Sequence, residues 1–238
     1  MLRLQQRIFD RKDYETGGMI IMIKRYKWTL FAASLMILCP IIVGIIFWDQ
    51  LPDMIPTHFG SDNQVNGWTS KPVAVFGMPL FLLAMEFFCA FMVGADPKRK
   101  NINQKLMRAI LWMIPILSVV TNLISYAIAL GMSVDTGMVV NILLGIMFVI
   151  MGNYMHKIKQ NYSVGIKLPW TLNSEENWNR THRVASWLFI MGGAIFVING
   201  FLQSKWVLFT FLACVFLIPA GYSFYLYKKG YKNHRQLD

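Results

Sequence analysis

Glu86 is the only acidic or basic residue within the long apolar stretches of this sequence. An ionisable side chain in such a stretch is expensive to bury and is a functional candidate by default. None of the stretches supplies a Lys or Arg to pair with it, so we expect its carboxyl group to be protonated or hydrogen-bonded. Glu86 therefore makes proton or ion transfer one function to consider.

Other patterns of catalytic or metal-binding type are weak. Asp53, His58 and Asp62 have suitable side chains for a metal ion, but their spacing is not diagnostic. Turn-capping aspartates and an interfacial histidine are the simpler interpretation. The motifs Gly-x-Ser-x-Gly and His-Glu-x-x-His are absent, and the three cysteines lie in separate apolar blocks. We therefore predict no metal ion, no cofactor, no disulfide and no enzymatic activity.

The composition identifies the kind of element that must position these residues. Hydrophobic residues make up 55% of the 238 residues and charged residues 15%, whereas an average globular chain has about 25% charged residues. The mean hydropathy is +0.44. Because the apolar residues also form long blocks, a soluble enzyme and a disordered chain are both excluded.

Six apolar stretches are long enough to cross about 30 Å of hydrocarbon as helices. They are continuous rather than alternating, which argues against a β-barrel. The sequence predicts an all-α fold, a polytopic membrane helix bundle with six transmembrane helices. The predicted spans are Trp28–Trp48, Pro72–Val93, Ala109–Met132, Gly137–Met155, Val184–Leu202 and Trp206–Tyr227.

The placement of Lys and Arg predicts the orientation in the cell membrane. Alternate segments outside the spans hold 21 of these residues on one side and 2 on the other. The positive-inside rule then puts both termini in the cytoplasm. The net charge of +11 is explained by this topology and by contact with the anionic lipid of the bilayer, so direct binding of nucleic acid is not needed.

Four segments follow along the chain. We predict a cytoplasmic N-terminal segment (1–27), an N-terminal membrane domain (28–108), a C-terminal membrane domain (109–227) and a basic cytoplasmic tail (228–238). Lys24, Arg25 and Lys27 precede the first apolar run, and no small-x-small cleavage site follows it, which is typical of a retained anchor. We expect residues 1–21 to be dispensable, untranslated or disordered, because they are polar and carry no periodic pattern.

The predicted outer loop, residues 49–71, is unusual for a solvated loop. Pro52 and Pro56 forbid a regular helix and favour extended backbone before them, and Gly60 and Gly67 mark turns. The loop is nevertheless rich in large apolar side chains. We therefore expect it to fold back onto the membrane surface or into a crevice between helices. The apolar residues are Leu51, Ile55, Phe59, Val65 and Trp68.

The predicted cytoplasmic loop, residues 156–183, leads into the fifth span. Asn173 followed by Glu176 resembles a capping box, so we expect a helix from about Ser174. Trp178 and His182 are four residues apart and share a face of that helix. Two interpretations remain open. The segment could anchor the entry into the fifth span, or it could be a docking surface for another protein.

Small and polar residues within the spans are typical of helix packing. Gly145 with Gly152, and Gly193 with Gly200, are each seven residues apart, which places them on one helix face for close approach. The asparagines within the spans are expected to hydrogen-bond between helices rather than to line a substrate path. These are Asn122, Asn141 and Asn199.

The two loops carry motifs that together resemble the SdpI family. Leu-Pro-Asp-Met-Ile-Pro-Thr-His-Phe-Gly (51–60) with Asn-Gly-Trp (66–68) resembles an uncharacterised membrane domain that commonly forms the N-terminal half of such proteins. Gly-Ile-Lys-Leu-Pro-Trp-Thr-Leu (165–172), Ser-Glu-Glu-Asn-Trp (174–178) and Thr-His-Arg (181–183) resemble the C-terminal half. The resemblance extends over roughly residues 22–227. Lys167 departs from the resemblance, since many relatives carry Arg at this position. The Lys side chain presents a single charged ammonium group in place of a guanidinium group that can form two parallel hydrogen bonds.

The resemblance implies an immunity and signalling protein of Gram-positive membranes. Such a protein is expected to protect the cell against a secreted toxic peptide outside and to hold an ArsR-type repressor at the membrane inside. The alternative is a small transporter or channel that uses Glu86. The expected ligand- or toxin-facing residues are Pro52, Asp53, Pro56, His58, Phe59, Gly67, Trp68 and Lys71. The expected partner-docking residues are Gly165, Lys167, Pro169, Trp170, Thr171, Glu175, Glu176, Trp178 and His182.

Overall fold

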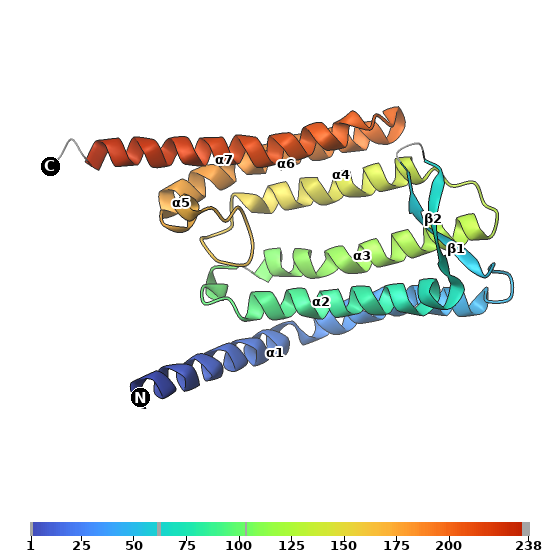
Figure 1. Ribbon diagram of the computed structural model, residues 1–238, viewed down its shortest axis with the longest axis horizontal. Coiled ribbons are helices and arrows are strands. Elements are labelled where there is room, and N and C mark those ends of the chain that lie inside the picture. Colours follow the sequence, from blue (N-terminus) through green and yellow to red (C-terminus); the bar gives the residue numbers. More distant parts are fainter. Residues whose placement is uncertain (1, 61–62, 103, 235–238) are drawn as a thin grey trace. The chain divides into compact units, whose positions relative to one another are not determined.

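The computed structural model of the chain describes residues 2–60, 63–102 and 104–234 and is mostly helical (Figure 1). A short β-hairpin is the one sheet within these residues. The elements in chain order are α1 (Leu2–Ile46), β1 (Met54–Phe59), β2 (Val65–Ser70), the π-helix η1 (Val73–Gly77), α2 (Met78–Gly94), the 3₁₀-helix η2 (Arg99–Asn101), α3 (Gln104–Ala129), α4 (Thr136–Met155), α5 (Pro169–Leu172), α6 (Glu175–Leu202) and α7 (Trp206–His234).

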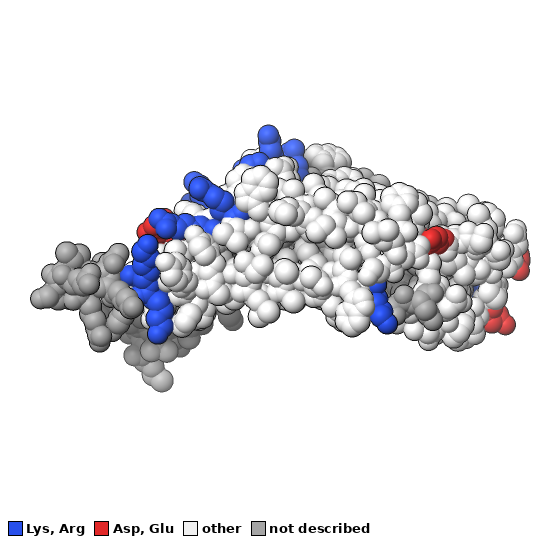
Figure 2. All heavy atoms as spheres, turned by 90° about the horizontal axis from the view of Figure 1, so that it is seen from above, with Lys and Arg blue, Asp and Glu red and all other residues white. Residues whose placement is uncertain are grey.

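Six of the described helical segments are long and apolar enough to cross a membrane. This confirms the predicted number of spans and the all-α class. Figure 2 shows one face on which charged side chains gather toward the ends and leave an uncharged middle, as lipid-facing helices require. The six segments are Ile23–Ile46, Val73–Gly94, Gln104–Ala129, Thr136–Met155, Glu175–Leu202 and Trp206–Gly230.

The chain forms two compact units. Unit 1 comprises Met1–Asp96 and Gln104–Thr136, so it holds α1, the hairpin, α2 and α3. Unit 2 comprises Pro97–Asn103 and Gly137–Asp238, with α4 to α7. The units are defined by packing, and α3 packs along α1 in unit 1. The domain boundary after residue 108 stays a prediction.

In unit 1, α1 is the central element and packs against both α2 and α3. Leu30, Ala33 and Ile37 of α1 are buried, and the hydroxyl group of Ser118 on α3 donates to the carbonyl oxygen of Ile37 at 3.0 Å. Asn122 donates to the Ser118 carbonyl of its own helix at 2.8 Å. The amide of Asn122 thus hydrogen-bonds within α3, whereas we expected a bond to another helix.

In unit 2, α4 and α6 cross at glycines, which are positions where the sequence predicts close packing. A Cβ atom added to Gly145 would lie 2.6 Å from the carbonyl oxygen of Gly193, and one added to Gly193 would lie 2.5 Å from that of Gly145. The two backbones therefore touch, and no larger residue fits at either position. Beside this contact, the side-chain amide of Asn199 donates to Oδ1 of Asn141 at 2.9 Å, which confirms the expected interhelical hydrogen bond.

Candidate functional site

The loop between α1 and α2 folds into the antiparallel hairpin β1–β2. Ile55 pairs with Thr69, Pro56 with Trp68, and His58 with Gly67, with irregular register on both sides of His58. Gly67 is required there, because a Cβ atom on it would lie 2.8 Å from the Cβ atom of His58. The extended backbone expected before Pro56 is present, since this proline lies within β1. A two-stranded sheet has only edge strands, where a residue without a backbone N–H is tolerated.

The base of the hairpin is held by an apolar cluster, which agrees with the second of the two expectations, that the loop folds into a crevice between helices. Leu51 and Ile55 are buried with Ala74, Val75 and Tyr126, which come from η1 and α3. The cluster explains why the segment is so apolar, since these side chains leave water as in any core.

Lys71, the residue that follows β2, closes the base of the hairpin. Its ammonium group donates to the carbonyl oxygen of Trp48 at 3.1 Å and lies 5.2 Å from the centroid of the Trp48 ring. Its backbone N–H donates to the Asp53 carbonyl at 2.8 Å. The Lys71 side chain is only 12% exposed, whereas that of Asp53, 3.8 Å away, is fully exposed. Lys71 is thus part of the scaffold of the hairpin.

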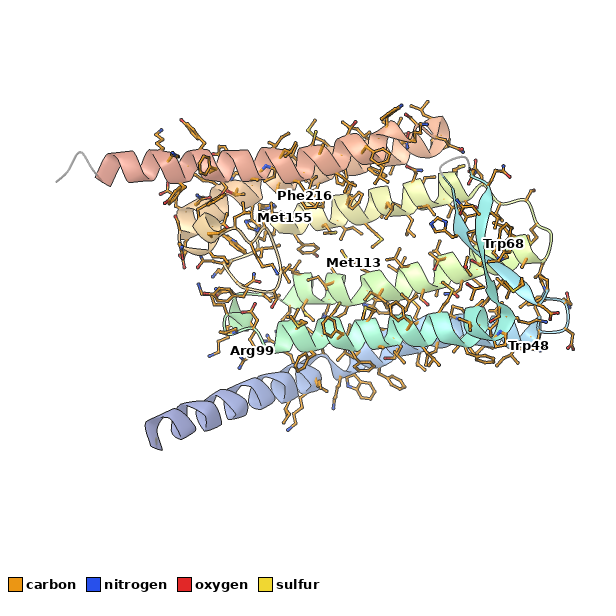
Figure 3. All side chains as sticks on the ribbon, in the orientation of Figure 1. Trp48, Trp68, Arg99, Met113, Met155 and Phe216 are labelled. Atoms are coloured by element: carbon orange, nitrogen blue, oxygen red, sulfur yellow. The ribbon has the colours of Figure 1, made fainter. Side chains whose placement is uncertain are left out.

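The outer face of the hairpin combines apolar and polar side chains. Met54 and Trp68 are 52% and 55% exposed. The exposed His58 lies beside them, with Nδ1 2.5 Å from Oδ1 of Asn66. Figure 3 labels Trp68 on the hairpin and Trp48 at the end of α1. Exposed aromatic and methionine side chains in one patch are typical of a surface that contacts another molecule.

The expected toxin-facing residues therefore divide into two groups. Pro52, Asp53, His58 and Trp68 are exposed, and Phe59 is half-buried. The other three shape the hairpin instead of facing outward: Pro56 is buried, Gly67 admits His58, and Lys71 binds Trp48. Met54 and Asn66 are also exposed on the hairpin, and no motif in the sequence pointed to them as surface residues.

The loop between α4 and α6 is organised around two buried rings on α6. The indole N–H of Trp178 donates to the carbonyl oxygen of Ile158 at 2.7 Å. His182 accepts the backbone N–H of Ile166 at its Nε2 atom, at 3.0 Å, and its Nδ1 atom lies 2.8 Å from the Trp178 carbonyl oxygen. These partners require a neutral imidazole with its proton on Nδ1. Gly165 has a φ of +118° and packs against both rings, where a Cβ atom would clash.

Thr171 and Gln160 fix the rest of this loop. The Thr171 hydroxyl accepts the backbone N–H of Leu168 at 2.9 Å. The amide of Gln160 donates to the carbonyl oxygens of Thr171 and Leu172, and its oxygen accepts from Lys98 at 2.5 Å. No motif pointed to Gln160 or Lys98, because their contact joins segments 62 residues apart.

The start of α6 differs slightly from the prediction. Ser174, rather than Asn173, is the N-cap residue, and its hydroxyl accepts the backbone N–H of Asn177 at 3.2 Å. The reason is that Asn173 is the C-cap residue of the short helix α5 and its backbone is still helical, while Ser174 is extended. Farther along, Asn177 bonds both the hydroxyl and the carbonyl group of Ser223, which ties α6 to α7.

The expected docking residues also divide by burial. Trp178, His182 and Thr171 are buried, and Gly165 and Trp170 are partly buried. Their contacts fix the loop, which supports the anchoring interpretation for these side chains. The remaining residues form its exposed surface: Lys167, Pro169, Glu175 and Glu176.

Glu86 is buried in α2, with 1% of its surface exposed. Among the described residues, its Oε1 atom has no hydrogen-bond partner. As for a metal ion, the described residues contain no cluster of three His, Cys, Asp or Glu side chains. Asp62, the third member of the weak Asp53–His58–Asp62 pattern, lies outside the described residues.

Comparison with known proteins agrees with this architecture. Residues 157–223, which include the α6 loop, match the SdpI/YfhL protein family, and residues 35–83, which include the hairpin, match a domain of unknown function, DUF1648. Over 204 residues the chain is 28% identical to the immunity protein SdpI of Bacillus subtilis (strain 168), covering 82% of this chain and 95% of that protein. No solved structure matches it.

Six apolar helices and these matches define a multi-pass protein of the cell membrane. Within that class, the chain is similar to the SdpI/YfhL family over its α6 loop and following helices, with the segment similar to DUF1648 in front of it.

Proposed function

We propose that this chain is an immunity and signal-transduction protein that protects a Gram-positive cell against a secreted toxic peptide. The observation that carries the proposal is the similarity to the immunity protein SdpI over nearly the whole length of that protein. The absence of paired catalytic motifs in the sequence agrees with a role that involves no enzymatic activity.

In this proposal the hairpin faces the outside of the cell and receives the peptide. The 21 to 2 distribution of Lys and Arg supports that orientation, with both termini in the cytoplasm. Trp68, Met54 and His58 would form the contact surface, since exposed aromatic anchors carry much of the energy of protein recognition. The base formed by Leu51, Ile55 and Lys71 holds that surface rigid, which lowers the entropic cost of binding.

On the cytoplasmic side, the α6 loop would hold an ArsR-type repressor at the membrane. The exposed surface of this loop carries Lys167, Pro169, Glu175 and Glu176. The buried pair Trp178 and His182 would fix its shape. In this proposal the α6 loop has exposed side chains that contact the repressor and buried side chains that hold its backbone in one conformation.

A survival assay tests the protective role. The full chain is expressed in a sensitive Gram-positive host, which is challenged with an SDP-type toxic peptide beside an empty-vector strain. We expect protection, and we expect Trp68→Ala to weaken it. Phe81→Ala is the matched control, because Phe81 is an equally exposed aromatic residue, at 62%, within a membrane span.

The same assay can contradict the proposal. A lack of protection by the full chain, with its presence in the membrane verified by immunoblot, would count against immunity. If the Trp68→Ala strain survived as well as the wild type, the proposal that the hairpin binds the peptide would be contradicted.

A small transporter or channel is the second candidate. It is favoured by one observation, the burial of the Glu86 carboxyl group with Oε1 unbonded among the described residues. Such a group within a membrane helix is the expected site of proton or ion coupling.

A further inference from the structure

A groove of about 720 Å³ lies in unit 2 between α5, α6 and the end of α7. Trp170 and Tyr227 form part of its wall, with ring centroids 6.1 Å apart and an interplanar angle of 27°. The ring of Phe224 lies 5.4 Å from that of Trp170. Aromatic side chains at the end of an apolar helix mark the headgroup level of a bilayer, so the groove opens where lipid headgroups lie.

The groove is basic. Arg180 and Lys229 line it and are both exposed, and among the described residues that line it Glu176 is the one acidic residue. Glu176 accepts a hydrogen bond from Nη2 of Arg180 at 2.7 Å, but both side chains are more than half exposed, so this pair contributes little. A guanidinium group has five N–H donors. Arg180 can therefore bind Glu176 and still donate to a second anion.

One polar group in the wall has no partner. The indole N–H of Trp170 is buried, and within the described part of the chain nothing accepts it. A buried donor left unbonded costs about 1–3 kcal/mol. Because this N–H has no accessible surface, the donors that the groove offers to a ligand are the two cations Arg180 and Lys229, and their charge is complementary to an anion.

From these observations, we propose that the groove between α5, α6 and α7 binds the phosphate of an anionic phospholipid headgroup, held by Arg180 and Lys229 against the Trp170–Tyr227 wall. Arg binds phosphate through its planar fork of donors and Lys as a point charge. The proposal is independent of the immunity function, because it depends only on the geometry of unit 2 and on its place at a membrane surface.

The test uses the full-length protein purified in a neutral detergent. Phosphatidylglycerol is titrated in, with phosphatidylcholine as the zwitterionic control, and bound lipid is counted by native mass spectrometry while the melting temperature is recorded. We expect phosphatidylglycerol to bind and to raise the melting temperature, and phosphatidylcholine to do neither. Equal effects of the two lipids would overturn the proposal.

Three variants locate the site. Arg180→Gln and Lys229→Gln should each weaken phosphatidylglycerol binding by about tenfold, the loss of one charge-assisted contact. Lys228→Gln is the matched control, because Lys228 carries the same charge one residue away and lies over the Phe224 ring without lining the groove. Equal weakening in all three would indicate a diffuse charge effect and contradict a defined site.

Two further measurements test whether the Glu176 carboxylate opposes binding and whether the ligand is a lipid or free phosphate. Glu176→Gln should bind phosphatidylglycerol more tightly, because it removes the competing carboxylate; an unchanged or weaker affinity would count against the groove. Inorganic phosphate at millimolar concentration should not displace the lipid. Displacement, with the same rise in melting temperature from phosphate alone, would assign the groove to a free anion and overturn the lipid assignment.

Discussion

The imidazole of His182 stacks on the indole of Trp178, with ring centroids 4.1 Å apart and 22° between the ring planes. Each ring bonds a different point of the loop that precedes α5, Trp178 at Ile158 and His182 at Ile166. The two side chains thus fix both ends of a nine-residue segment to one face of α6. A loop that would otherwise be mobile becomes part of the folded unit.

Replacing His182 by Ala should release this segment. The backbone N–H of Ile166 loses its acceptor in a buried place, which costs about 1–3 kcal/mol. Hydrogen–deuterium exchange of residues 158–166 should then accelerate. Asn179→Ala is the control, since Asn179 is exposed on the same helix. Unchanged exchange in the His182 variant would show that the contacts of Trp178 and Gln160 are sufficient to hold the segment.

Replacing Gly145 by Ala should destabilise unit 2. The new methyl group would lie 2.6 Å from the Gly193 carbonyl oxygen, so α4 and α6 must separate, at a typical cost of about 1–3 kcal/mol. Gly221→Ala, in the middle of α7, adds a methyl group with nothing within 4 Å and should cost no stability. Thermal unfolding in detergent compares the two, and equal melting temperatures would contradict the close crossing.

Lys71→Met should loosen the hairpin. The variant keeps the apolar stem but loses the charged hydrogen bond to the Trp48 carbonyl, worth about 1.5–3 kcal/mol. Asp53→Asn should leave stability unchanged, because Asp53 is fully exposed. Exchange rates at β1 and β2 report on this difference. Similar rates in the two variants would mean that Lys71 acts only through its pairing with Asp53.

Glu86→Gln separates the two candidate functions. Glu86 lies 13 residues beyond the start of η1, about 20 Å along the helix from the hairpin, so a receptor should keep its protection when this group can no longer ionise. A transporter that couples flux to Glu86 should lose that flux in the Glu86→Gln variant. Survival and proton flux in vesicles are measured on the same variant, and a loss of both would favour the transporter.

The orientation is open to chemical labelling. In a chain whose three native cysteines are replaced by Ala, a cysteine at the exposed Ser70 should react with a membrane-impermeant maleimide on intact cells. A cysteine at the exposed Lys167 should react only after the cells are permeabilised. The reverse pattern would invert the proposed topology.

The sequence predicted the parts of the fold that depend on local composition. Apolar blocks predicted the six spans, and glycine spacing predicted a closely packed face on each of α4 and α6, because both patterns are repeated along one helix. That these two faces pack against each other was not predicted. The two-stranded hairpin was expected only as extended backbone with turns. Its six-residue strands contain Pro56 and Gly67, which are atypical of strands, and only the partner strand reveals the pairing.

The candidate sites were predictable in position but less so in role. The motifs identified both loops, yet residues such as Lys71, Trp178 and His182 proved to hold the backbone in place. Burial of a loop residue depends on segments that fold over it, as residues 158–166 fold over Trp178. Local patterns contain no information about such coverage.

The reciprocal contact of Gly145 and Gly193 also restricts how this sequence can change over generations. Each glycine is blocked by the other's carbonyl oxygen, an atom that every amino acid carries. A second substitution therefore cannot make room for the first, unlike in a core where a smaller neighbour compensates for a larger one. A larger residue at either position would require a whole helix to shift. We therefore expect both positions to remain glycine while the lipid-facing residues around them vary.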